Sequence, residues 1–213
     1  MEPRLLDLTG DPRRAHFDYF RTMANPYLSV TANCDITPLR EKTLREGLPF
    51  FLPLLYCAAN AANDVPELRR RIRGDTAVEY SQCDSSHTVA LPDGSYCYCR
   101  LNCRQSFARF LPYAQAEVER TKAAPCIDDG EDGDSLLFVS SLPWLSFTGL
   151  SLPLPQPADS NPRITWGKYF CQKDRTLLPV TLLAHHALVD GIHIAQFYEA
   201  LDRELAAIAA EEA

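Results

Sequence analysis

The chain has 213 residues, of which 46% are hydrophobic and 23% charged, and this ordinary globular composition allows a sizeable core. Its 28 acidic residues outnumber its 21 basic ones, giving a net charge of -7. Binding to nucleic acid or to an anionic membrane relies on clustered Lys and Arg, so the charge argues against both partners. One short basic run, LRRRIR at 68–73, is interpreted as a solvated helix end.

The N-terminal region contains no apolar run behind a charged head, so we expect no signal peptide and a cytoplasmic location. Residues 13–23 place Phe17 and Phe20 at the spacing of one helix face and therefore predict a helix. Residues 27–37 alternate and are rich in β-branched side chains, which predicts a strand. Pro38 is expected to open a short helix, because the first turn tolerates proline.

The longest apolar stretch, residues 49–62, is interrupted by Pro53 and Asn60. It is shorter than the roughly 20 residues that a membrane span needs. We interpret it as a buried helix and expect no membrane segment.

The middle of the chain alternates between strands and helices. Residues 76–103 predict short strands with a turn at PDGS, where Asp and Gly suit turn geometry. Residues 106–124 predict an amphipathic helix interrupted near Pro112. The acidic run at 128–134 lacks the ligand spacing of a calcium loop and is interpreted as a solvated loop.

The last third predicts a strand at 135–152 with a bend at Pro143, a proline-rich connection, and a hairpin around Lys173. Asp190 suits the N-cap of a long amphipathic helix that follows it. Helices and mostly antiparallel strands are intermixed throughout. The predicted fold is α/β, a two-layer sandwich of a mixed, mostly antiparallel sheet with helices, as one domain over residues 1–213.

Eight cysteines are present, but the absence of an export signal favours reduced thiols over disulfides. The spacing of Cys97, Cys99 and Cys103 is not that of paired zinc ligands. These cysteines are interpreted as small buried side chains.

The segment HHALVDGIH, residues 185–193, carries the strongest chemical signal. Adjacent strand residues point to opposite faces, so His185 and His186 cannot converge on one zinc ion, and we expect no metal. A histidine held in one tautomer can act as a general base at neutral pH. Alternatively, Asp190 is only a helix cap and the histidines are hydrogen-bonded core residues. The spacing alone leaves both interpretations open.

The same segment resembles the active-site motif of the chloramphenicol acetyltransferase family, which belongs to a wider group of coenzyme-A-dependent acyltransferases. Four further segments agree with that family in order and spacing, so the resemblance covers essentially the whole chain. They are RRAHFDYF (13–20), CDIT (34–37), VSSLPWLSFT (139–148) and ITWGKY (164–169).

The resemblance implies the family's fold and direct acetyl transfer from acetyl-CoA to a hydroxyl group, without an acyl-enzyme. It implies that His186 is the general base and that its tautomer is held by its own backbone carbonyl. Asp190 would be structural and paired with Arg13. Ser140 would hydrogen-bond the oxyanion of the tetrahedral intermediate, and Thr165 would hold a water near it.

The resemblance also implies a coenzyme A channel lined by Trp144, Lys168 and Tyr169. It implies a homotrimer in which one subunit supplies the base to its neighbour's pocket. The acceptor pocket departs from the family pattern, because Phe20 stands where a tyrosine often contacts the acceptor, with Tyr19 one position earlier.

The sequence is therefore compatible with three functions. The first is O-acetyl transfer to chloramphenicol or a related compound, and the second is the same chemistry on another hydroxyl or amine acceptor. The third is a non-catalytic protein that binds a small molecule, which would have no use for a base.

Overall fold

The computed structural model describes residues 2–130 and 132–211. Within them, seven strands form one large sheet in the order β2-β10-β8-β7-β5-β6, with β9 paired to β10. Its strands are β2 (Tyr27–Asp35), β5 (Asp84–Ala90), β6 (Tyr96–Leu101), β7 (Leu136–Ser141), β8 (Arg163–Trp166), β9 (Phe170–Gln172) and β10 (Arg175–His185). A small sheet holds β1 (Arg4–Leu5), β4 (Thr76–Glu79) and β3 (Arg70–Arg73) in that order.

The helices are α1 (Arg14–Phe20), α2 (Thr37–Glu46), α3 (Phe51–Asp64), α4 (Phe107–Ala123) and α5 (Gly191–Ala210), with short 3-10 turns at η1 (Pro66–Arg69) and η2 (Gly133–Ser135). In the large sheet, β7 pairs in parallel with β5 and with β8. The remaining pairs, β2–β10, β8–β10, β9–β10 and β5–β6, are antiparallel. The prediction of a mixed, mostly antiparallel sheet is confirmed.

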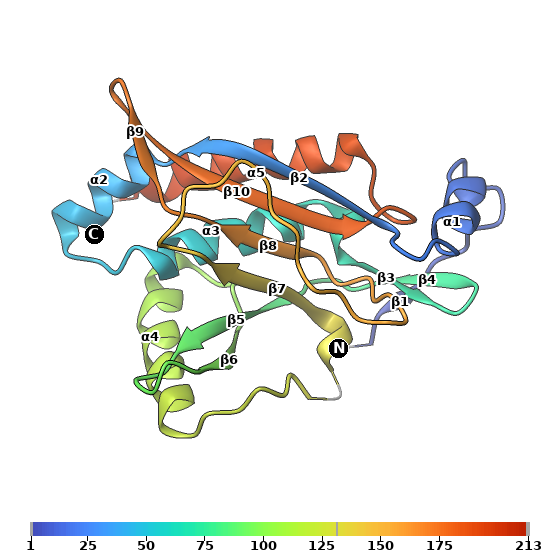
Figure 1. Cartoon of the computed structure of the whole chain (residues 1–213), viewed down its shortest axis with the longest axis horizontal. Coiled ribbons are helices and arrows are strands. Elements are labelled where there is room, and N and C mark those ends of the chain that lie inside the picture. The colour runs from blue at the N-terminus through green and yellow to red at the C-terminus, as the bar shows by residue number, and fades with distance from the viewer. Residues whose placement is uncertain (1, 131, 212–213) are drawn as a thin grey trace.

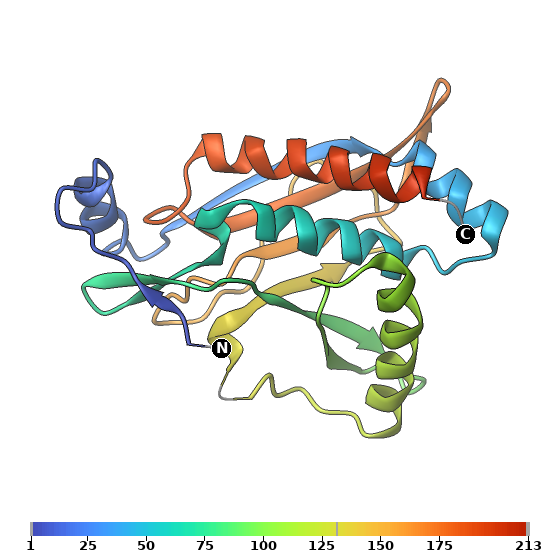
Figure 2. The same ribbon diagram turned by 180° about the vertical axis from the view of Figure 1, so that it is seen from behind.

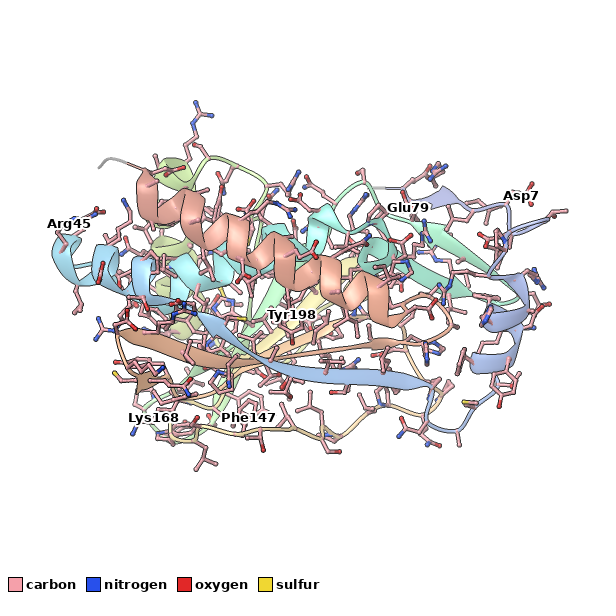
Figure 3. All side chains as sticks on the ribbon, turned by 90° about the horizontal axis from the view of Figure 1, so that it is seen from above. Asp7, Arg45, Glu79, Phe147, Lys168 and Tyr198 are labelled. Atoms are coloured by element: carbon pink, nitrogen blue, oxygen red, sulfur yellow. The ribbon has the colours of Figure 1, made fainter. Side chains whose placement is uncertain are left out.

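Helices α3 and α5 lie side by side on one face of the large sheet (Figure 2). The Tyr198 hydroxyl of α5 lies within hydrogen-bond distance of the carbonyl oxygens of Val180 (2.8 Å) and Val30 (3.0 Å) and can donate to either, which ties the helix to β10 and β2. The segment 142–162 crosses the opposite face (Figure 1), where Figure 3 shows Phe147 and Lys168 away from α5. The helix layer and the sheet enclose the core.

The direction of the strands decides where functional residues gather. The arrowheads of β5, β7 and β8 point to the end of the sheet near α4, whereas the arrowhead of β10 points to the opposite end, near α1 (Figure 1). Side chains at the ends of β7 and β10 therefore lie far apart within one chain.

Two predictions about local structure were wrong. Pro112 does not interrupt α4: it lies in the second turn and is exposed, its missing N–H removes only one intrahelical hydrogen bond, and the helix continues to Ala123. The basic run is not a solvated helix end, since Arg71 is fully buried on β3. Its guanidinium donates to four backbone carbonyl oxygens, those of Leu68, Arg70, Asp134 and Leu136.

The described cysteines are free, six buried and two exposed. No helix among residues 2–130 and 132–211 has the length and apolarity needed to span a bilayer.

Candidate active site

The strand-to-helix corner after β10 separates its two histidines. His185, the last residue of β10, is buried and packs edge-on against Tyr27. Burial lowers the pKa of His185 from 6.5 to about 4, so the ring is neutral at neutral pH. His186 is half-buried, and its backbone N–H donates to the Pro26 carbonyl (2.7 Å). Only His186 is therefore exposed enough to meet a substrate.

The ring of His186 is held at Nδ1 and on one face. Nδ1 lies 3.0 Å from the Val189 carbonyl oxygen and 3.3 Å from Asp190 Oδ1. The partner of Nδ1 is thus Val189, and the expectation that the ring bonds its own residue's carbonyl was wrong. A proton on Nδ1 leaves the lone pair of Nε2 free to accept another.

Phe20, at the end of α1, stacks on the other side of this corner. Its ring centroid lies 3.9 Å from that of His186, with planes 20° apart. Tyr19 packs edge-on against Phe20 at 5.1 Å and is largely exposed. Of the two residues predicted to bind the acceptor, Phe20 thus contacts the imidazole directly, and Tyr19 contacts Phe20.

Arg13 joins the N-terminal segment to the corner. Its guanidinium donates to Asp190 Oδ1 (2.8 Å), to the Leu188 carbonyl (2.7 Å) and to the His186 carbonyl (3.3 Å). The side chains of Arg13 and Asp190 are 23% and 34% exposed, so the ion pair is only partly buried. Its loss should therefore cost less than that of a fully buried pair. The contact between Arg13 and Asp190 itself is as predicted.

His193, in the first turn of α5, contacts both Asp190 and η1. The backbone N–H of Asp190 donates to His193 Nδ1 (2.9 Å), and His193 Nε2 lies 4.0 Å from Glu67. Burial lowers the pKa of His193, which keeps the ring neutral and Nδ1 able to accept. The start of α5 is thereby fixed beneath the carboxylate of Asp190.

A second group of predicted residues lies on the large sheet. Ser140 of β7 is paired in register with Thr165 of β8, and their hydroxyl oxygens are 2.9 Å apart. Thr165 is in turn opposite Thr181 of β10, whose hydroxyl lies 2.7 Å from that of Thr31. The hydroxyls of Ser140 and Thr165 therefore begin a polar row across four strands.

The two groups do not meet within one chain. His186 follows Thr181 by five residues, and each strand residue advances the chain by about 3.3 Å while neighbouring strands lie about 4.8 Å apart. His186 is therefore roughly 15–20 Å from Ser140 of the same chain.

Two cavities meet at the Ser140–Thr165 pair. The register between β5 and β7 ends at His87 and Val139, although both strands continue beyond it. A cavity of about 930 Å³ opens there towards α3 and α4, and another of about 290 Å³ lies nearby. The residues that line both are His87, Thr88, Ser140, Leu152 and Thr165.

Of the three residues predicted to line a coenzyme A channel, one lines the larger cavity and two do not. Trp144 is exposed and lines the larger cavity, whereas Lys168 and Tyr169 are not among its lining residues. Tyr169 instead contacts Arg40, whose guanidinium lies 5.3 Å from the ring centroid. The loop that carries Trp144 lies so close to Gly167 that a Cβ there would be 2.5 Å from the Leu145 carbonyl oxygen. Only glycine fits at that position.

Sequence reasoning missed three polar residues at the cavities. His87 is buried, and burial lowers its pKa from 6.5 to about 4. Ser86 is also buried and donates a short hydrogen bond to Asp129, in the acidic loop. Alternation along β5 predicted the strand, but no local pattern indicated which of its polar residues line a cavity.

The described residues contain no group of three or more His, Cys, Asp or Glu side chains placed to hold a metal ion.

Comparison with known proteins places this arrangement in a family. A family model described as chloramphenicol acetyltransferase matches residues 1–202. Chloramphenicol acetyltransferase 2 of Escherichia coli is 31% identical over 200 residues, which cover 92% of this chain and 93% of the relative. A chloramphenicol acetyltransferase of Streptomyces acrimycini is 30% identical over 219 residues, covering 96% and 94%.

Solved structures agree in fold. A chloramphenicol acetyltransferase superimposes with a TM-score of 0.84 at 26% identity, covering 96% of this chain and all of that one. The cubic core of the pyruvate dehydrogenase multienzyme complex has the same fold, with a TM-score of 0.70 at 19% identity over 99% of this chain and 92% of that one. The fold and the matched relatives define an acyltransferase enzyme. The chain belongs to the chloramphenicol acetyltransferase family.

Proposed function

We propose that this protein is an O-acetyltransferase that moves the acetyl group of acetyl-CoA to a hydroxyl of chloramphenicol or a related small molecule. The observation that carries the proposal is the junction of two cavities at the hydroxyls of Ser140 and Thr165. Two substrates that approach from different sides can meet at such a junction. A protein that only binds a small molecule needs neither the second cavity nor an exposed, oriented imidazole.

In the proposed mechanism, Nε2 of His186 accepts the proton of the acceptor hydroxyl while the hydroxyl oxygen attacks the thioester carbonyl carbon. The Val189 carbonyl supports this step, because it accepts the proton of Nδ1 and so keeps the lone pair on Nε2. The carboxylate of Asp190 lies 3.3 Å from Nδ1 and is bonded to Arg13, so it helps to hold the ring and the corner in place. The tetrahedral intermediate then expels the coenzyme A thiolate, which takes the proton back from Nε2.

Ser140 and Thr165 serve the oxyanion of that intermediate in this proposal. A hydroxyl aimed at developing charge in a partly dry cavity stabilises the transition state more than the ground state. Ser140 would donate directly, and Thr165 would orient Ser140 or a water beside it. Their 2.9 Å contact supports this division, because it holds both hydroxyls at one place.

The proposal requires a second subunit. His186 and Ser140 of one chain are too far apart to act on the same atom, so the base would come from the neighbour in a homotrimer. Family membership supports this arrangement, and so does the position of the half-exposed His186 at an outer corner of the sheet. The larger cavity, with Trp144 at its lining, is the proposed site for acetyl-CoA.

The direct test measures free thiol release from acetyl-CoA with chloramphenicol as acceptor. Wild type should release thiol and the His186→Ala variant should not, while His16→Ala, a substitution of an exposed histidine on α1, should behave as wild type. Release that survives His186→Ala would remove the base from the proposal. Light scattering should give the mass of a trimer, and a monomer would contradict a shared site.

Another acceptor is the second candidate. The observation that favours it is the polar lining of the smaller cavity by Ser86, Asp129 and Arg163. A screen of hydroxylated and aminated acceptors in the same thiol assay separates it from chloramphenicol itself.

A further inference from the structure

Among the residues that the structure describes, no cation is paired with the one free carboxylate of the smaller cavity, that of Asp129. Two charged side chains line it, Arg163 and Asp129. Arg163 is already paired with both carboxylate oxygens of Asp159, at 2.8 and 2.6 Å, and its guanidinium lies 5.3 Å from the centroid of the Phe138 ring. In the described part of the chain, the side-chain partner of Asp129 is the neutral hydroxyl of Ser86. The cavity therefore carries the uncompensated charge of Asp129.

Ser86 holds this carboxylate in place. Its side chain is 3% exposed and its hydroxyl donates to Oδ1 of Asp129, which leaves Oδ2 for a ligand. Asp129 also lies close enough to Tyr98 to contribute to raising the pKa of that phenol, after burial and Tyr96. A carboxylate oriented by a buried serine needs little rearrangement to accept a charged hydrogen bond.

The position of Asp129 sets a distance from the reacting hydroxyls. Ser86 is opposite Phe138 in the sheet register, and Phe138 precedes Ser140 by two residues. The Ser86–Asp129 pair is therefore roughly 7 Å along the strands from Ser140. A small molecule can span that distance.

His87 is a second group at the smaller cavity that calls for a hydrogen-bond donor on the ligand. It lines both cavities and is 2% exposed, and its Nδ1 has no hydrogen-bond partner. The ring hydrogen-bonds to the Cys99 backbone, and because Nδ1 is unpaired we assign that bond to Nε2–H. The neutral ring then presents the lone pair of Nδ1. A buried acceptor without a partner is costly unless a ligand or a water donates to it.

We infer that the acceptor of this enzyme is a hydroxylated amine, bound with its hydroxyl at Ser140 and Thr165 and its ammonium group at Asp129. Both unsatisfied groups at the cavity, Asp129 and His87, accept hydrogen bonds, so the complementary ligand is rich in donors. An acceptor that carries a carboxylate or phosphate is excluded by the charge of Asp129. The inference rests on the proposed function, because it names the substrate class of the proposed acceptor cavity.

The test uses two acetyl acceptors that differ only in the substituent on one nitrogen. In chloramphenicol this nitrogen is a neutral amide, and in the second compound, from which the dichloroacetyl group has been removed, it is a free amine. We measure kcat/KM for both by thiol release, at a pH where the amine is protonated. Asp129→Asn keeps an oxygen for Ser86 but removes the charge. Its matched control is Asp128→Asn, because Asp128 is in the same loop and does not line either cavity.

The ratio of kcat/KM for the amine to that for chloramphenicol should fall about tenfold in Asp129→Asn, because a charge-assisted hydrogen bond is lost. It should stay within about twofold of wild type in Asp128→Asn. An equal ratio in wild type and Asp129→Asn, with thiol release intact, would overturn the inference and leave the proposed function standing.

Direct binding covers the remaining outcome. If neither compound supports thiol release although acetyl-CoA binds, the proposed function fails, and calorimetric titration of the amine decides the inference separately. Tighter binding to wild type than to Asp129→Asn supports it, and equal binding overturns it. His87 offers the second hydrogen-bond acceptor at the cavity. His87→Phe removes it and should raise the KM for the amine, whereas His87→Asn keeps a hydrogen-bond acceptor at that position and should give a KM close to that of wild type.

Discussion

The two ends of the large sheet each hold residues that are predicted to be catalytic, but the surroundings of these residues differ. At the end of β10, His186 is fixed by Val189, Asp190 and Phe20 and lines neither of the two cavities at Ser140. At the end of β7, Ser140 and Thr165 lie where two cavities meet, and the imidazole that lines these cavities with them, His87, is 2% exposed. Each end lacks what the other has. A well-ordered imidazole and a well-formed cavity can thus be separate halves of one proposed site.

The largest effect is expected at the imidazole. His186→Ala should lower kcat by about 10²–10⁴-fold, because the acceptor hydroxyl then loses its general base. The melting temperature should change little, since the ring is half-exposed. Thiol release and calorimetry on the same preparation measure both. A large loss of stability would mean that His186 holds the corner together rather than acting on substrate.

The two buried histidines should affect stability instead, in a way that depends on pH. The pKa values of His87 and His185 are about 4 in the folded protein against 6.5 for a free side chain, so the unfolded chain binds more protons between these values. The free energy of unfolding should fall as pH drops from 6.5 towards 4, by roughly 3 kcal/mol for each histidine.

Melting curves across this pH range check the prediction. His185→Phe should flatten the decline by removing one of the two titrating groups. An unchanged slope in that variant would show that His185 is not buried in the neutral form.

Arg13 gives a smaller effect. Arg13→Lys keeps a charge near Asp190 but cannot donate to all three oxygen acceptors at once, so unfolding should require about 1–2 kcal/mol less free energy. Arg14→Lys is the matched control, because Arg14 pairs with Asp18 on the surface. Urea unfolding of both variants measures the difference. Equal stability would mean that the contacts of Arg13 do not hold the corner.

The smallest effect is expected from the ring that stacks on the imidazole. Phe20→Leu removes a contact of 3.9 Å between centroids, which is of the kind worth about 0.5–1.5 kcal/mol. We expect kcat to fall a few-fold because His186 is held less firmly, with the melting temperature nearly unchanged. A change confined to the KM of the acceptor would instead make Phe20 a substrate contact, as the sequence suggested.

The sequence predicted the larger strands and helices in their order, though neither β1 nor β3, and it predicted the contact between Arg13 and Asp190. Local periodicity and an ordered set of motifs carry that information. It did not predict that Arg71 is buried, since a run of arginines looks solvated until β3, η2 and β7 come together around it. Nor did it predict His87 or Asp129, because lining a cavity depends on where β5 and β7 diverge. Long-range packing of this kind has no signature in a single segment.

The central claim is that the base and the oxyanion group of one site come from different subunits. The most direct measurement mixes two inactive variants, His186→Ala and Ser140→Ala, by co-refolding them in equal amounts. Each alone should be strongly impaired, by about 10²–10³-fold for Ser140→Ala. If subunits mix at random in a closed trimer, about one quarter of the sites combine an intact His186 with an intact Ser140, and about that fraction of wild-type activity should return. A mixture no more active than its two components would contradict the account.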